Sequence, residues 1–197
     1  MTTENKLHSS FAKDHYLLRR KVFTLFGGAF HVYDNIGQIL FYSKQKAFKL
    51  KEDFRVYADE RMEEELLTIK TPQILDIGAT YNVQDPATGE EVGAIRRRGL
   101  KSIFKDEWLF LSNQGIEIGK LTETSVAGAM LSRIVNLIPQ NYMVVGNDGR
   151  SVASIKQHFN PFVLKYSMTI HEPQPLIDRR LLLTAGILLA GIEGRQQ

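Results

Sequence analysis

The segment that most constrains the fold is an uncharged apolar run close to the end of the chain. It extends from Leu181 to Ile192, directly after Asp178-Arg179-Arg180, and is apolar on every face of a helix. A helix at a protein surface would carry one polar face, so this one must be surrounded. A bilayer span needs about 20 such residues, more than this run contains. We therefore predict a short helix at about residues 178–192, enclosed by the protein's own chain.

The composition is ordinary for a soluble globular domain. The 197 residues are 43% hydrophobic and 24% charged, which fits a single domain. The absence of cysteine rules out disulfides, thiolate metal sites and cysteine catalysis. The net charge of +3 does not by itself indicate a nucleic-acid partner. Residues 1–14 are polar and show no apolar targeting segment, so we expect a flexible arm followed by one domain, 15–197, in a cytoplasmic protein without a cofactor.

Four polar turns between strand-like segments indicate a series of β-hairpins. Each combines Asp or Asn with Gly, residues that tolerate left-handed backbone, at Asp34–Gly37, Asp85–Gly89, Asn113–Gly115 and Gly146–Gly149. Apolar and polar residues alternate between the turns, most clearly over 162–170. The other predicted strands are Lys21–Phe26, Ala29–Tyr33, Ile39–Ser43, Arg55–Ala58, Ile74–Val83, Glu91–Arg96, Trp108–Leu111, Glu117–Thr122, Tyr142–Val145 and Ser151–Phe159. So many strands predict a closed barrel or a sandwich.

Two further segments have helix-like features. Met62–Leu67 is rich in helix formers, but the surrounding β pattern favours a strand at Leu66–Lys70, because propensity is a weak guide. Thr124–Leu137 carries apolar residues at helical spacing, with Thr124 as N-cap and Pro139 after its end. This pattern favours an amphipathic helix that plugs one mouth of a barrel over a helix that binds a partner.

The predicted β-strands and the terminal helix can bury their apolar surfaces against each other. The shell needs an apolar filling, and the helix needs an apolar container. Asp178 offers an N-cap oxygen, while Gly191 and Gly194 offer positions where the chain turns out again. The simplest fold is therefore mainly β with little α: a closed antiparallel barrel around a buried C-terminal helix.

Several short motifs, taken in order, resemble those of the LURP-one-related family. They are Tyr16–Phe23, Phe30–Asp34, Ala47–Leu50, Gly93–Arg98 and Asp106–Trp108, followed by the apolar terminal helix. The family is related to the tubby C-terminal domain and to the phospholipid scramblases, and the resemblance extends over about Tyr16 to Glu193. It implies a tubby-like barrel of about twelve strands around a central helix.

The resemblance implies a binding role. Tubby domains bind phosphoinositide head groups through basic residues on the barrel wall, including a Gly-Lys-Leu-Arg strand. The similar strand here reads Gly93-Ala94-Ile95-Arg96, which keeps the arginine and has Ala94 at the lysine position. Scramblases carry a cysteine-rich palmitoylated segment and a proline-rich N-terminal arm, and this sequence shows neither. Scramblase-like lipid movement is therefore less favoured.

Two groups of basic residues form the candidate ligand-binding site. They are Arg96, Arg97, Arg98 and Lys101, and a second group with Lys44 and Lys46. Guanidinium forks suit phosphate oxygens, and an anionic bilayer attracts each nearby basic residue by about 1 kcal/mol. On a strand, Arg96 and Arg98 share one face and Arg97 lies on the other. The alternative is a solvated barrel wall whose lysines protect against aggregation.

Other patterns favour neither an enzyme nor a metal site. Gly27-Gly28 is not followed by a P-loop lysine, the histidines lack zinc-ligand spacing, and the serines lie in no nucleophile elbow. We therefore predict a non-enzymatic domain that binds anionic phospholipid, or another phosphate-bearing ligand, peripherally at a membrane. The alternative is a protein-interaction scaffold that uses the barrel mouth or the helix near Met130. We expect no nucleic-acid partner and no transmembrane segment.

Overall fold

The computed structural model describes residues 7–20, 28–45, 53–71, 78–98, 107–124, 139–160 and 163–193. Its strands are β1 (His15–Arg20), β2 (Ala29–Tyr33), β3 (Ile39–Gln45), β4 (Asp53–Tyr57), β5 (Glu65–Lys70), β6 (Thr80–Asp85), β7 (Glu90–Arg98), β8 (Glu107–Leu111), β9 (Glu117–Glu123), β10 (Asn141–Gly146), β11 (Ser151–His158) and β12 (Lys165–Ile170). Each strand pairs antiparallel with the next, and β12 closes the barrel on β1. The predicted closed, mainly β barrel is confirmed.

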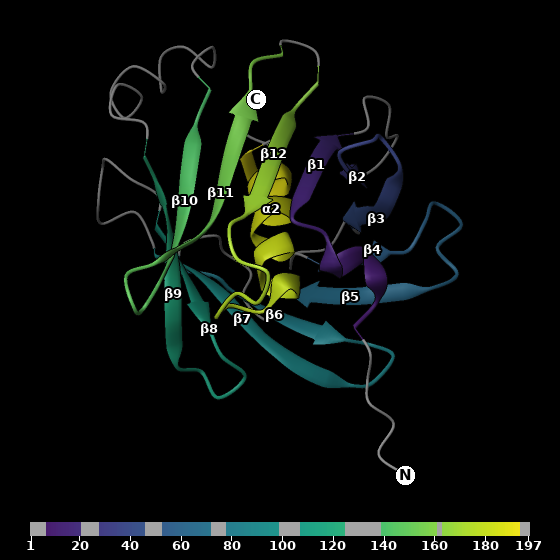
Figure 1. The fold of residues 1–197 in the computed structure, drawn as a ribbon. Helices are drawn as coiled ribbons and strands as arrows, with labels where there is room; N and C mark the ends of the chain where they lie inside the picture. The colour runs from purple at the N-terminus through teal and green to yellow at the C-terminus, as the bar shows by residue number, and fades with distance from the viewer. Residues whose placement is uncertain are drawn as a thin grey trace.

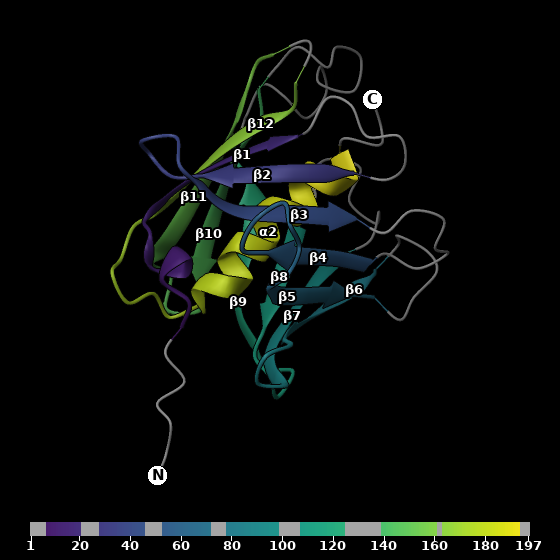
Figure 2. The same ribbon diagram turned by 90° about the vertical axis from the view of Figure 1, so that its right-hand side faces the viewer.

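The helix α2 (Arg179–Glu193) runs inside this barrel. Figures 1 and 2 show β1 and β12 on one side of α2, with β6 and β7 on the other side. Strands that face each other across α2, such as β1 and β7, are therefore far apart in the order of strands around the barrel.

The four predicted hairpin turns are confirmed. They join β2 to β3, β6 to β7, β8 to β9 and β10 to β11, and each contains a glycine with positive φ. In the first turn, the Asp34 carboxylate accepts hydrogen bonds from the backbone N–H groups of Ile36 and Gln38, at 3.0 and 2.8 Å. Gly37 there adopts a φ of 85°, which costs glycine little. Local side-chain chemistry thus fixes these turns.

Most predicted strands coincide with observed ones. The strand favoured at Leu66–Lys70 is β5, and in β12 the side chains of Tyr166, Met168 and Ile170 are buried, as their alternation predicts. The strand predicted at Lys21–Phe26 and residues 125–137 of the predicted plug helix lie outside the described residues.

The structure adds two elements before the first predicted strand. β1 was not predicted because Tyr16, Leu17 and Leu18 are apolar in succession, which hides the alternation; Tyr16 and Leu18 point inward and Leu17 outward. The 3₁₀ helix η1 (Ser9–Ala12) carries Phe11, which is 2% exposed and packs on Phe41 with ring centroids 4.8 Å apart. The barrel therefore buries an aromatic side chain from the segment before β1.

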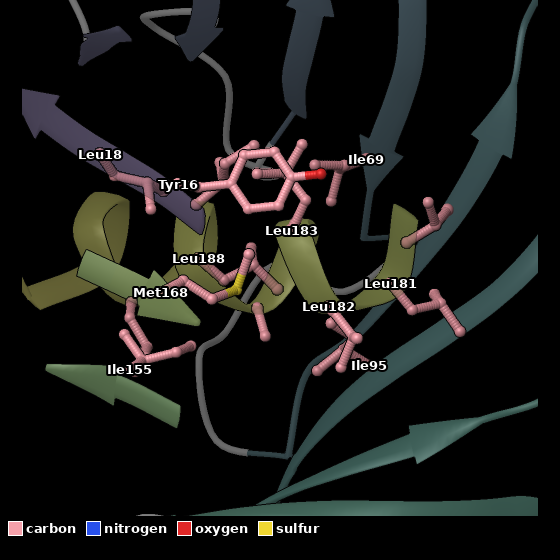
Figure 3. Close-up of a cluster of buried hydrophobic side chains, with 14 of the residues drawn as sticks. Tyr16, Leu18, Ile69, Ile95, Ile155, Met168, Leu181, Leu182, Leu183 and Leu188 are labelled. Atoms are coloured by element: carbon pink, nitrogen blue, oxygen red, sulfur yellow. The ribbon is translucent and has the colours of Figure 1, made fainter. Parts of the chain in front are cut away.

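The terminal helix fills the barrel, as its uniformly apolar sequence predicts. Its side chains from Leu181 to Ala190 are all buried. Figure 3 shows Leu181, Leu182, Leu183 and Leu188 among Tyr16, Leu18, Ile69, Ile95, Ile155 and Met168 from the surrounding strands. Burying a large apolar side chain is worth about 1.5–3 kcal/mol, so α2 contributes a large share of the core energy.

An ionic cluster around the buried Arg180 guanidinium holds the start of α2. The Asp178 carboxylate caps the helix, accepting from the backbone N–H of Arg180 at 2.8 Å. The Arg180 side chain donates to Glu90 at 2.7 Å and to Asp178 at 2.8 Å. Burial lowers the pKa of Arg180, but the hydrogen bonds and charges of Asp178 and Glu90 outweigh burial and raise it. The cluster ties the helix to the rim of β7.

The expectation that the chain turns out at Gly191 is wrong. Gly191 lies inside α2, where an added Cβ would stand 2.6 Å from Cε1 of Phe54. Its missing side chain serves close packing of the helix against β4. Gly194 lies outside the described residues.

Candidate functional site: the Arg96 face

The candidate basic residues of β7 fall on two faces of the strand, as predicted. Arg96 and Arg98 are exposed and point outward, while Ile95 is fully buried in the core. In register, Arg96 lies opposite Thr80 and Leu109, and Arg98 lies opposite Glu107. We use the term Arg96 face for the outward side chains of Thr80, Arg96, Arg98, Glu107 and Lys120.

Charge on the Arg96 face is only partly compensated. Arg98 donates to Glu107 at 2.9 Å, and the Lys120 ammonium lies 3.6 Å from the same carboxylate. Arg96 donates through Nε to the Thr80 hydroxyl at 3.2 Å and forms no ion pair with any described residue. One carboxylate thus serves two cations, and the terminal nitrogens of Arg96 bond to no described residue, which suits a bidentate contact with phosphate.

Arg97 has a different environment. Its guanidinium carbon lies 5.5 Å from the ring centroid of Trp108, its neighbour in register on β8. Trp108 is 4% exposed and belongs to the core. Such a cation–π contact is worth about 0.5–1 kcal/mol at an exposed site. Arg97 therefore packs on the core edge and does not join Arg96 and Arg98 on the Arg96 face.

The second basic group is separated from the first. Lys44 is exposed on β3, opposite Ala29 and Arg55, and three strands lie between β3 and β7 in the barrel order. Lys46 and Lys101 lie outside the described residues. The sequence-based site thus divides between two parts of the wall.

The comparisons with known proteins agree with this architecture. A family model described as LURP-one-related matches residues 15–190. This chain belongs to the LURP-one-related family. No significant match was found among curated proteins. The family and the barrel are consistent with a non-enzymatic binding domain.

This LURP-one-related barrel has a pocket of about 550 Å³ beside the start of α2, which we call the mouth pocket. It is lined by Leu7, His8, Phe11, Glu64, Glu65, Leu66, Asp85, Ala87, Thr88, Glu90, Asp178 and Arg180. Five carboxylates stand there against the single guanidinium of Arg180, so the pocket repels phosphate. Sequence patterns do not reveal this pocket, because two of its lining residues, Arg180 and Glu90, are 90 positions apart.

The outer wall also carries a hydroxyl–imidazole cluster that the sequence patterns do not predict. His171 contacts the hydroxyl of Ser151 at 2.9 Å through Nδ1 and that of Ser154 at 3.1 Å through Nε2. No described carboxylate bonds to His171, so among the described residues the cluster does not form a complete triad.

The described part of this LURP-one-related chain bears on metal binding and on membrane insertion in two ways. Over the described ranges, no group of three or more His, Asp or Glu residues is arranged to hold a metal ion. Among the described helices, none combines the length and apolarity needed to cross a membrane.

Proposed function

We propose that this protein is a non-enzymatic domain that binds anionic phospholipid, or another phosphate-bearing ligand, through the Arg96 face. The observation that carries the proposal is the exposed guanidinium of Arg96, which has no carboxylate partner among the described residues. Arg98 and Lys120 flank it and share one carboxylate, Glu107. The face therefore presents an excess of positive charge together with one fork that fits phosphate.

The charge distribution favours the barrel wall over the barrel mouth for such a ligand. The mouth pocket is dominated by carboxylates, and a phosphate group entering it would meet Glu64, Asp85 and Glu90. On the wall, removing two positive charges weakens attraction to an anionic bilayer by about 2 kcal/mol, which is roughly 30-fold in affinity. An effect of this size is easily measured.

Co-sedimentation with vesicles of graded phosphatidylserine content tests the proposal. The variant Arg96→Gln/Arg98→Gln is compared with wild type at low and physiological salt. Lys13→Gln/Arg61→Gln is the matched control, because it removes the same charge from exposed sites outside the strands, before β1 and in the connection between β4 and β5. We expect binding that rises with anionic lipid, falls with salt and weakens only in the Arg96 variant. Equal binding by both variants would remove the Arg96 face from the proposal.

One observation favours the alternative, a protein-interaction module. The mouth pocket has the charge to receive a basic segment of a partner protein. This function predicts co-purification with a partner independently of lipid, and loss of the partner in Glu64→Gln/Glu90→Gln. Co-purification that survives this substitution excludes the pocket as the contact.

A further inference from the structure

Acidic residues are segregated to one half of the barrel. The neighbouring strands β10, β11, β12, β1, β2 and β3 contain no Asp or Glu at all. Every acidic residue in the described strands lies in β4 to β9: Asp53, Glu65, Asp85, Glu90, Glu91, Glu107, Glu117 and Glu123. We call the six strands without acids the acid-free half; they carry Arg19, Arg20, Lys44, Lys156 and Lys165.

The register places basic side chains of the acid-free half in a row. Arg19 of β1 lies opposite Lys165 of β12, and Lys165 lies opposite His158 of β11. Side chains directly opposite each other have Cβ atoms about 4.5–5.5 Å apart, and like charges in such pairs destabilise a sheet. Among the described residues, neither Arg19 nor Lys165 forms an ion pair. Like charges thus face each other along the row, and an external anion would stabilise it; an acid near it is Glu60, which pairs with His31, the partner of Arg19 in register on β2.

The environment of His158 reports the same positive potential. Burial lowers the pKa of His158, and the charges of Lys165 and Lys156 lower it further. Its Nε2 contacts the Ser167 hydroxyl at 2.9 Å, so the ring is held against the wall beside Lys165. The imidazole of His158 is therefore held where Lys165 and Lys156 make the electrostatic potential positive.

An exposed aromatic side chain adjoins the row. Phe159 follows His158 directly at the end of β11 and is 56% exposed. A large apolar side chain beside basic residues is typical of surfaces that lie on a bilayer, where the cations meet head groups and the ring enters the acyl boundary. A soluble phosphate ligand would gain nothing from this ring.

We infer that the acid-free half docks on an anionic bilayer, with Arg19, Lys165 and Lys156 over the head groups and Phe159 in the interface. The inference rests on the proposed function in taking anionic phospholipid as the ligand, but it adds a contact on a different wall. β12 and β7 lie on opposite sides of α2 (Figures 1 and 2), so one flat bilayer touches one of the two walls at a time. The two contacts can therefore fail separately.

The test uses phosphatidylcholine vesicles with and without phosphatidylserine, and the full chain throughout. Arg19→Gln/Lys165→Gln should weaken binding about 30-fold, while the control Lys13→Gln/Arg61→Gln, with the same change in net charge, binds like wild type. Phe159→Ser should weaken vesicle binding roughly tenfold through lost apolar burial, and should leave binding of inositol hexakisphosphate unchanged. Circular dichroism establishes that each variant is folded.

The outcomes separate the two proposals. Loss only in Arg19→Gln/Lys165→Gln supports the docking surface and removes the Arg96 face. Loss only in Arg96→Gln/Arg98→Gln supports the Arg96 face and overturns the docking surface. If Phe159→Ser changes nothing on vesicles, the acid-free half is a general polyanion surface and bilayer docking is overturned. Absence of wild-type binding at any lipid composition overturns both.

Discussion

Two glycines of α2 provide a matched test of how tightly the barrel encloses its helix. A Cβ added at Gly191 would stand 2.6 and 2.8 Å from the ring of Phe54, which is fully buried. A Cβ added at Gly186 would lie 3.2 Å from Leu18, at the end of a side chain that can move. Both substitutions to Ala gain the same intrinsic helix propensity, about 1 kcal/mol. Their difference in stability therefore reports packing alone.

The packing costs differ enough to be resolved. Overpacking against a rigid ring costs about 1–3 kcal/mol, so Gly191→Ala should lower the free energy of unfolding by about 1 kcal/mol. A small shift of Leu18 accommodates the methyl group at position 186, so Gly186→Ala should raise the free energy by up to about 1 kcal/mol. For a chain of this length, a difference of about 2 kcal/mol corresponds to roughly 4–8 °C in Tm.

Urea unfolding and thermal melts of both variants measure this difference. Adding Phe54→Leu to Gly191→Ala should recover part of the loss, and the double-mutant cycle gives the coupling energy between the two positions. If Gly191→Ala is as stable as Gly186→Ala, or more stable, then β4 does not confine the end of the helix and the packing account is wrong.

Three further predictions concern stability. Arg180→Met should lower the free energy of unfolding by about 1–3 kcal/mol, because it leaves partly buried carboxylates without their cation. Urea titrations measure this loss, and the control Arg61→Met, at an exposed ion pair, should cost under about 0.5 kcal/mol. Burial raises the pKa of Tyr16 to about 12 from 10.0, so its contribution is complete below about pH 10 and is lost as pH rises to about 12; Tyr16→Phe should flatten the pH dependence of stability in that window. Trp108 is the single tryptophan, so Arg97→Ala should change the fluorescence of the folded state and cost about 0.5–1 kcal/mol; an unchanged spectrum would refute the ring contact.

Local patterns were sufficient to predict the barrel and its helix. The run from Leu181 to Ile192 lacks any polar face, and only enclosure satisfies such a helix. Hairpin turns such as Asp34–Gly37 depend on bonds within a few residues, so they are readable from sequence. β1 escaped prediction because Leu17 is apolar on the outer face. Gly191 was misread because Phe54, which explains it, is distant in the sequence.

The candidate sites were predictable only in part. Alternation along β7 separates Arg97 from Arg96 and Arg98 without any knowledge of the fold. The compensation of Arg98 by Glu107 depends on strand register, which sequence patterns do not specify. The row that joins Arg19 to Lys165 exists because β12 closes the barrel on β1, a contact between the two ends of the chain. Which charged side chains become neighbours on the wall depends on how the barrel closes, and local sequence patterns do not specify that closure.

Site-specific labelling tests most directly the claim that the barrel wall, and not its mouth, contacts anionic membranes. The chain has no cysteine, so single variants can carry an environment-sensitive fluorophore without background. Leu17→Cys reports the acid-free half, Asn82→Cys lies beside the Arg96 face, and Ala87→Cys lines the mouth pocket. We expect phosphatidylserine vesicles to change the emission of a wall label and to leave the Ala87 label unchanged. A response at Ala87 alone, or at none of the three positions, would contradict the account.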